Sequence, residues 1–346
     1  MHRRVGLTKA PAVTPFQISI SSRLQPLTVN DRLALAMTAW EFFSPVRQEL
    51  ALSVLGLPSN PDPIRPLSVR QFTLYLEKTG VLANSVRYIA QIKGLLDAME
   101  REGLLVAMGH GDFVMAPKLY YSLKQLTKME GRSWAWLTPA LGPDFLYSYF
   151  GSHTVHIIGD KDGEERGGTG WIISSRHVLT CAHVVTGMTV RPVQHFQLAA
   201  CNVIGIHAHP TIDVGIIEMS QPVLSADPPI GFRDPIIGEQ LYVLGYPPVP
   251  MATEAALILQ AGEVVNQGIN GYSGQDVFLY SAIARPGNSG GPIIARSGHI
   301  LGIVTEDRFN HSHPHALFFA GISASTIAGA LLELDVDVTL PIESYE

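Results

Sequence analysis

Three short segments hold residue types that together could carry out nucleophilic attack on a carbonyl carbon. In chain order they are Thr180-Cys181-Ala182-His183-Val184-Val185, Thr211-Ile212-Asp213-Val214-Gly215-Ile216-Ile217 and Arg285-Pro286-Gly287-Asn288-Ser289-Gly290-Gly291-Pro292. A serine hydroxyl is a weak nucleophile at neutral pH, so it needs a base within hydrogen-bond reach and a third group that orients the base. Ser289, His183 and Asp213 are the residue types that these three roles require.

Each segment taken alone has a plainer interpretation. The glycine-rich segment could be only a turn, His183 could be a half-buried histidine beside an apolar strand, and Asp213 could cap a turn. The pattern Gly-x-Ser-x-Gly also fits the nucleophile elbow of α/β-hydrolases, which must lead straight into a helix. Gly290-Gly291-Pro292 is poor helix material, and residues 293–295 and 300–304 predict strands around a turn. This β-rich context and the order His, Asp, Ser argue against the elbow.

The three segments, in this order, resemble those of the trypsin-like serine peptidases, and the HtrA/Deg-like branch in particular, over roughly residues 151–346. The resemblance implies an all-β fold of two packed six-stranded barrels with the catalytic residues in the cleft between them. Short apolar runs separated by Gly, Pro and Asp turns across residues 153–326 agree with such a fold. The resemblance also implies catalytic roles for His183, Asp213 and Ser289, and an oxyanion hole formed by the N–H groups of Gly287 and Ser289.

A substrate pocket is implied by the same resemblance, about six residues before the serine and along the strand after it. Those positions correspond to Ile283 and Ala284, with Thr305, Glu306 and Asp307 on the facing wall. An apolar floor favours an aliphatic side chain before the cut, because a buried Arg or Lys would lack a partner. Two alternatives stay open: Glu306 or Asp307 could turn inward to pair with a basic residue, and Thr305 could instead donate a hydrogen bond to Asp213.

Two features depart from the family pattern. Only 57 residues follow Ser289, enough to finish a barrel and a helix near 325–334, so we expect no PDZ domain of the HtrA kind. Asn288 stands where trypsin-type zymogens use an aspartate to pair with a freed amino terminus, so activation by cleavage is not expected. We therefore expect a regulatory protein partner, or the N-terminal half of the chain, to control the protease.

The N-terminal half predicts a mainly α-helical domain. Apolar periodicity predicts helices over 28–43, 68–80 and 85–103, and then a hairpin over 104–117. Asn30 or Asp31 is expected to cap the first helix, and Ser68 and Ser85 the next two. The order resembles a winged helix-turn-helix domain. The predicted organisation is therefore a tail (1–27), a winged-helix-like regulatory or docking domain (28–132), an aromatic-rich connector (133–150) and a protease domain (151–346).

Winged helices often bind DNA through their third helix, so the charges there bear on the partner. The segment 85–103 mixes Arg87, Lys93 and Arg101 with Asp97, Glu100 and Glu102, a nearly neutral balance. A phosphate-binding surface should be strongly basic, which favours protein docking and leaves DNA as an alternative. The aromatic connector is expected to pack on one of its neighbouring domains, or to form the first strand of the barrel.

Charge and cysteine content bound the remaining possibilities. Residues 1–150 carry 16 Lys/Arg and 11 Asp/Glu, whereas residues 151–346 carry 8 Lys/Arg and 19 Asp/Glu. The net charge of −6 is therefore the sum of a basic first half and an acidic second half. That asymmetry is consistent with an acidic partner, or with mutual attraction of the halves. Only Cys181 and Cys201 are present, and no apolar stretch suits a signal peptide or a membrane span, so we expect a cytoplasmic protein without a membrane partner.

No metal or cofactor is expected. The tract His311-Ser312-His313-Pro314-His315 could bind a metal, but no acidic or cysteine ligands cluster with it in sequence, so a solvated loop is predicted. The leading hypothesis is thus a cytoplasmic serine endopeptidase that cleaves a protein substrate. Trypsin-like domains joined to extra modules occur in bacterial stress and phage-defence systems, and by analogy the substrate would be one dedicated protein. The alternatives are a DNA-binding regulator with a sensing or self-cleaving protease-like half, and a scaffold with a vestigial triad.

Overall fold

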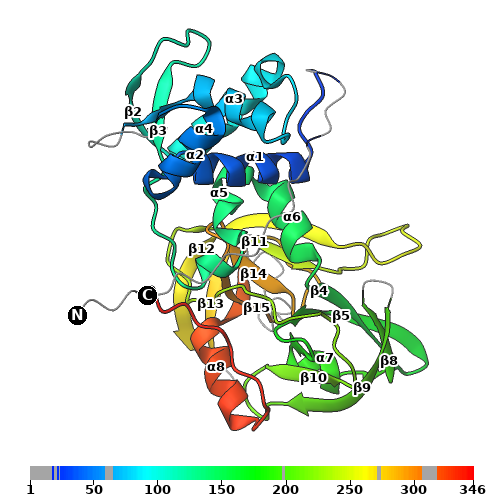
Figure 1. Ribbon diagram of the computed structural model, residues 1–346. Coiled ribbons are helices and arrows are strands. Elements are labelled where there is room, and N and C mark those ends of the chain that lie inside the picture. The colour runs from blue at the N-terminus through cyan, green and yellow to red at the C-terminus, as the bar shows by residue number, and fades with distance from the viewer. Residues whose placement is uncertain are drawn as a thin grey trace. The chain divides into compact units, whose positions relative to one another are not determined.

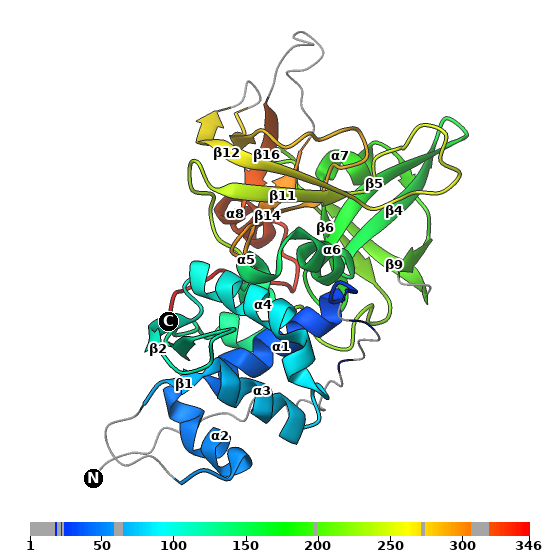
Figure 2. The ribbon, with the colours of Figure 1, turned by 90° about the horizontal axis from the view of Figure 1, so that it is seen from above.

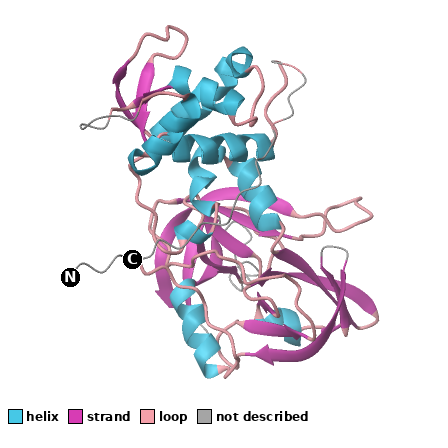
Figure 3. Ribbon diagram, in the orientation of Figure 1, coloured by secondary structure: helices cyan, strands magenta, loops and turns pink. Residues whose placement is uncertain are grey.

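The chain divides into two compact units, Met1–Gln125 and Leu126–Glu346 (Figure 1). The structure is a computed structural model that describes residues 18, 22, 24–58, 65–196, 199–270, 274–305 and 318–346. The described part of the first unit is mainly helical, and that of the second is mainly β-strand (Figure 3).

The first unit combines α-helices with a small antiparallel sheet in the order β1-β3-β2. Its α-helices are α1 (Val29–Phe42), α2 (Gln48–Leu55), α3 (Val69–Lys78) and α4 (Ile89–Arg101), and its strands are β1 (Leu67–Ser68), β2 (Val106–His110) and β3 (Lys118–Tyr121). Short 3-10 turns, Pro45–Arg47 and Ser85–Tyr88, precede α2 and α4. The core lies between α1, α3 and the sheet, where Phe42, Phe43, Phe72 and Tyr120 are buried with their rings in contact.

Helix starts in this unit agree with the sequence in part. Ser68 caps α3 as predicted, with its hydroxyl accepting from the Gln71 N–H. The prediction for α1 was wrong: Thr28 is the cap, and Asp31 completes a capping box as the third residue of the helix. Ser85 begins a 3-10 turn rather than capping an α-helix directly. Helix α2 was not predicted, because it has only eight residues, too few to show a clear helical repeat of apolar side chains.

The second strand of the predicted hairpin was also misplaced. Residues 113–117 were expected to form it, but the strand is Lys118–Tyr121. Pro117 has no N–H to donate to a ladder, and Ala116 N instead donates to Phe113 O in a turn. The apolar run therefore lies in the connection between β2 and β3, and pairing begins only after the proline.

The connector belongs to the second unit and is helical. Residues 133–150 contain α5 (Thr138–Leu141) and the start of α6 (Pro143–Gly151), so the alternative that they form a barrel strand was wrong. Leu146 and Phe150 are fully buried in the core of the second unit, with the Phe150 ring 6.0 Å from that of Trp171. The aromatic residues thus anchor the chain to the strands that follow.

The first half of the β-structure is a curled seven-stranded sheet and not the predicted closed six-stranded barrel. Its strand order is β7-β4-β5-β6-β10-β9-β8. The strands are β4 (Thr154–Lys161), β5 (Glu164–Ile172), β6 (His177–Thr180), β7 (Thr189–Val190), β8 (Val193–Phe196), β9 (Ala199–Ala208) and β10 (Gly215–Met219). Between β4 and β8 a side chain replaces the ladder: buried Gln194 accepts from Ile158 N and donates to Ile158 O, at 2.9 and 2.8 Å.

The second half is a closed six-stranded barrel, as predicted. Its order is β11-β12-β13-β16-β15-β14, with β11 (Gln240–Gly245), β12 (Ile258–Asn270), β13 (Asp276–Tyr280), β14 (Pro292–Ala295), β15 (Ile300–Val304) and β16 (Phe319–Ser323). Every residue of β14 and β15 is buried, which explains their nearly continuous apolar sequences. Helix α8 (Ala324–Glu333) lies one residue earlier than expected and packs against β15 and β16 (Figure 2).

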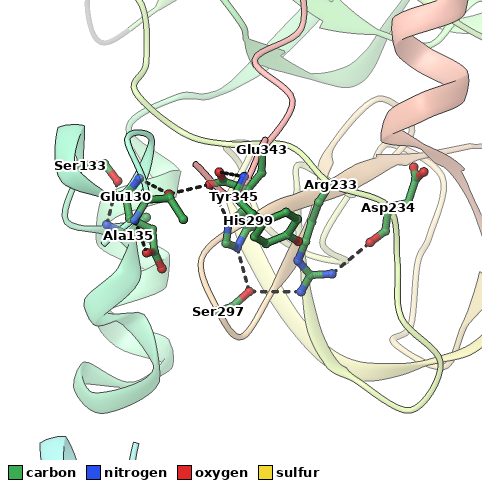
Figure 4. A network of polar contacts seen from close by, with 10 residues as sticks. Glu130, Ser133, Ala135, Arg233, Asp234, Ser297, His299, Glu343 and Tyr345 are labelled. Atoms are coloured by element: carbon green, nitrogen blue, oxygen red, sulfur yellow. Dashed lines mark hydrogen bonds and ion pairs between the residues drawn. The ribbon is translucent and has the colours of Figure 1, made fainter. Parts of the chain in front are cut away.

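The last residues are fixed to the barrel by a buried polar network (Figure 4). Glu343 is 6% exposed and accepts hydrogen bonds from Thr127 Oγ1 at 3.0 Å and from His299 at 3.3 Å. Backbone bonds join Phe232 to Pro341 and to Glu343, at 2.8 and 2.7 Å. Burial, and then the nearby Arg233 charge, hold the pKa of His299 below its ordinary value. Burial raises the pKa of Glu343, but the hydrogen bonds that it accepts outweigh this and lower it.

Candidate active site

The pairing of β6 with β10 brings His183 and Asp213 together. Thr180, the last residue of β6, pairs with Gly215, the first residue of the antiparallel β10. His183 lies three residues after that pair and Asp213 two residues before it, so both leave the sheet at the same edge. The sequence suggested an apolar strand beside His183, and that strand, β6, ends at Thr180. His183 itself lies in the one-turn helix α7 (Ala182–Thr186).

Asp213 binds the histidine through both carboxylate oxygens. Oδ2 is 2.7 Å from His183 Nδ1, and Oδ1 accepts from the His183 backbone N–H at 2.8 Å. Thr305 Oγ1 donates to Oδ2 at 2.6 Å, and the Asp213 N–H donates to Gln275 Oε1 at 3.0 Å. Burial raises the pKa of Asp213, but the hydrogen bonds from His183 and Thr305 outweigh it and hold the pKa below its ordinary value. The carboxylate therefore stays ionised and keeps the imidazole in one orientation.

Ser289 lies in the turn that leads into β14. Gly287 and Gly290 have φ values of +95° and +82°, a region that L side chains rarely adopt. A Cβ on Gly290 would lie 2.2 Å from Thr169 O, so no other residue fits there without movement. Within the described residues, the N–H groups of Gly287 and Ser289 donate to no protein atom. Both are therefore available to a negatively charged oxygen, as an oxyanion hole requires.

The carbonyl of Val304 connects the turn that contains Ser289 (residues 287–290, the serine turn) to the chain at the start of α7. It accepts the N–H of Gly290 at 2.8 Å and the thiol of Cys181 at 3.0 Å. The residue after Ser289 and the residue two before His183 thus contact the same atom, and Thr305, which follows Val304, contacts Asp213. One strand end therefore holds all three candidate catalytic residues in one region.

A possible metal-binding group coincides with this site. In the described ranges, the only three potential ligand residues that converge are Cys181, His183 and Asp213, whose ligand atoms lie within 4.8 Å of one another. Their hydrogen bonds already occupy them: the thiol donates to Val304, and the imidazole and carboxylate bind each other. The tract 311–315, considered above as a metal site, lies outside the described residues.

A groove of about 200 Å³ opens beside the serine turn. It is lined by Pro247, Pro248, Val249, Pro250, Ile258, Gln260, Ile283, Arg285 and Asn288. Of the residues assigned to a substrate pocket from sequence, Ile283 lines this groove, Ala284 packs on the barrel core, and Thr305 instead contacts Asp213. Glu306 and Asp307 lie outside the described residues.

Several residues of the site gave no recognisable signal in the sequence. Gln275 and Thr169 contact the candidate triad region from distant parts of the chain, at sequence separations of 62 residues from Asp213 and 118 residues from Gly287. Pro247, Pro248 and Pro250 lie in the loop between β11 and β12, and their position beside the serine turn depends on how these two strands pair.

Residues 168–303 match the family described as a trypsin-like peptidase domain. Serine protease Rv3671c of Mycobacterium tuberculosis (strain ATCC 25618 / H37Rv) is 28% identical over 172 residues, which are 46% of this chain and 41% of that protein. Protease Do-like 1, chloroplastic, of Arabidopsis thaliana is 25% identical over 142 residues, 40% of this chain and 32% of that protein. The chain thus spans less than half the length of these curated relatives.

The active form of the Rv3671c protease from M. tuberculosis has a solved structure that aligns with this one. The alignment covers 58% of this chain and 88% of that chain, with 22% identity and a TM-score of 0.46. Among the described residues, no helix combines the length and the apolar character needed to cross a membrane.

Proposed function

We propose that this chain, which carries a trypsin-like peptidase domain, is a serine endopeptidase that uses His183, Asp213 and Ser289. The observation that carries the proposal is the combination of a bidentate Asp213–His183 pair with a serine turn whose Gly287 and Ser289 N–H groups donate to none of the described residues. An orienting carboxylate, a base, a nucleophile and two oxyanion donors are the complete set that acyl transfer from an amide requires.

The mechanism follows from these groups. Ser289 Oγ forms a bond to the carbonyl carbon of the substrate, and its proton passes to His183 Nε2. The electron pair of the carbonyl π bond moves to the oxygen, where the N–H groups of Gly287 and Ser289 bind it. Collapse of this intermediate breaks the C–N bond, and the amine leaves with the proton from His183. Water repeats the sequence and releases the carboxylic acid. Asp213 stabilises the imidazolium at both stages.

Digestion of an unfolded protein tests the proposal. Reduced, alkylated casein incubated with the wild-type chain should yield peptides, and Ser289→Ala should yield none. Ser281→Ala is the control, because Ser281 is exposed, directly follows β13 of the same barrel, and forms its hydrogen bonds within the described residues with Glu263. Equal digestion by wild type and Ser289→Ala would show that another group, or a contaminant, is responsible.

For the N-terminal unit we propose a winged-helix-like docking or regulatory role. Its sheet order β1-β3-β2, with α3 and α4 between β1 and β2, supports this topology. Basic side chains near α4 are matched by acidic ones: Lys93 pairs with Asp97, and Lys118 lies 2.7 Å from Glu100. Such neutralised lysines favour a protein partner over DNA. Full-length chain that bound one duplex sequence selectively at physiological salt would instead support the DNA-binding alternative.

We further propose that the protease prefers an uncharged aliphatic side chain before the cut and works in the cytoplasm under control of a partner or of its N-terminal unit. Ile283 at the groove supports the aliphatic preference. Among the described residues neither cysteine forms a disulfide, and both are buried, which suits a reducing compartment. A peptide library scanned at the position before the cut tests the preference, and efficient cleavage after Arg or Lys would contradict it.

A further inference from the structure

Thr169 is a fully buried polar residue of β5 that contacts the serine turn from the other half of the second unit. It is 0% exposed, and its hydroxyl forms hydrogen bonds with two backbone groups. Its hydroxyl donates to Gly287 O at 2.6 Å and accepts from Tyr246 N at 2.9 Å. Its own N–H donates to Ser289 O at 3.0 Å. One residue therefore binds the carbonyls of both Gly287 and Ser289, the two residues proposed to supply the oxyanion donors.

We infer that Thr169 is a positioning residue that sets the oxyanion hole through its hydroxyl. The inference rests on the proposed function and assigns a role to a residue outside the triad. Gly287 has a φ of +95°, and binding of its carbonyl by Thr169 fixes the following peptide plane relative to β5. With the Ser289 carbonyl held as well, the N–H groups of Gly287 and Ser289 keep a fixed separation. Preorganised donors stabilise a developing charge because they need no rearrangement during the reaction.

The surroundings of Thr169 hold it in place from the opposite side. Thr180 Oγ1 donates to Thr169 O at 2.7 Å. A Cβ on Gly290 would lie only 2.2 Å from the same Thr169 oxygen. Gly287 is equally confined, since a Cβ there would lie 2.6 Å from Tyr246 O. The Thr169 hydroxyl thus connects β5 to the serine turn and to Tyr246, which directly follows β11. The close contacts around Gly287 and Gly290 leave these backbone segments little room to move.

Two substitutions of Thr169, to valine and to serine, distinguish the effect of losing the hydroxyl from the effect of changing the side-chain volume. Thr169→Val keeps the shape but leaves Gly287 O and Tyr246 N without their partner, whereas Thr169→Ser keeps the hydroxyl and loses only a methyl group. Thr138 gives a matched control: it is 2% exposed and its hydroxyl donates to Ala135 O, also at 2.6 Å, in a helix of the same unit. Thr138→Val removes an equivalent bond without touching the serine turn.

The test measures modification of full-length protein by a biotinylated fluorophosphonate over a range of probe concentrations, which separates the maximal rate from the apparent affinity. We expect Thr169→Val to lower the maximal rate on the order of 100-fold, the loss seen when one oxyanion donor is removed. The apparent affinity should be unchanged, and Thr169→Ser should recover most of the rate. Thr138→Val should react as the wild type does, although its thermal midpoint falls.

Two results would overturn this inference but not the proposed function. One is a folded Thr169→Val protein that reacts at the wild-type rate, and the other is a Thr169→Ser protein that reacts as slowly as Thr169→Val. If Thr169→Val fails to fold, Thr169→Ser and Thr169→Ala decide, because both lack the methyl group and differ only in the hydroxyl. Equal rates for that pair would overturn the inference. A wild-type protein that does not react at all would overturn the proposed function, and this inference with it.

Discussion

Replacing Asp213 with asparagine changes only one oxygen to an amide nitrogen, yet the hydrogen bonds of the site leave that amide no good orientation. Three donors converge on the carboxylate: the His183 backbone N–H on Oδ1, and His183 Nδ1 and Thr305 Oγ1 on Oδ2. An amide has one acceptor oxygen. If its oxygen faces Oδ2's partners, its NH2 group faces the His183 N–H, and a buried donor loses its acceptor at a cost of about 1–3 kcal/mol.

In the other orientation the amide oxygen still accepts the His183 backbone N–H, but the imidazole can no longer act as the base. The NH2 group then faces His183 Nδ1, which must become the acceptor, and the imidazole proton moves to Nε2. Nε2 can no longer take the proton of Ser289. A wrong tautomer of this kind lowers turnover by about 10⁴, which corresponds to about 5.4 kcal/mol at 1.36 kcal/mol per factor of ten.

Hydrolysis of p-nitrophenyl acetate at pH 7.5, followed at 400 nm, measures this loss, and circular dichroism checks the fold. Asp276→Asn is the matched control, since it removes the charge of an exposed carboxylate close in sequence to Gln275. We expect Asp213→Asn to remain folded and to lose about 10⁴ in rate, and Asp276→Asn to lose nothing. A loss of less than tenfold in folded Asp213→Asn would refute the assignment of Asp213 as the group that orients His183.

Three further predictions concern stability. Thr305→Val removes one of the donors to the Asp213 carboxylate and should lower the free energy of unfolding by about 1.5–3 kcal/mol in urea titrations, with Thr305→Ser restoring it; an unchanged value for the valine variant would contradict the assigned bond. Gly290→Ala and Gly163→Ala share a φ of +82°, but only Gly290 has atoms within 4 Å of the new Cβ, so Gly290→Ala should unfold at a markedly lower temperature, and equal thermal midpoints would be evidence against the packing described. Burial lowers the pKa values of His153, His156, His177 and His299, so the unfolded chain binds protons near pH 6.5 that the folded chain does not, and stability should fall as the pH falls from 7 to 5; urea titrations of His299→Gln should show a shallower decline, and an identical slope would count against burial of a neutral His299.

Local patterns in the sequence predicted the parts of the site that depend on neighbouring residues. The serine turn needs two glycines at positive φ within four residues, a requirement that the sequence displays directly. The Ser68 cap and the strands predicted over 293–295 and 300–304 likewise depend on residues a few positions away. The sequence also gave the order of the three candidate catalytic residues, although their proximity depends on the register of β6 and β10.

Contacts between distant segments could not be predicted in the same way. A threonine in the glycine-rich segment Gly167-Gly168-Thr169-Gly170 looks like an ordinary strand residue until β5 is placed against the serine turn. Gln194 looks like a surface residue, yet its side chain connects β4 to β8, where a closed barrel would have backbone hydrogen bonds. Buried polar side chains of this kind are chosen by the backbone groups that they meet, which only the folded chain defines.

Covalent modification of the nucleophile shows whether Ser289 has that role. Full-length wild-type protein is treated with diisopropyl fluorophosphate at pH 7.5, digested, and the modified peptide is sequenced by tandem mass spectrometry. We expect a single adduct on Ser289 in the wild-type protein and no adduct in His183→Gln, although that variant remains folded. An adduct on another residue, or a folded wild-type protein that gains no adduct, would contradict it.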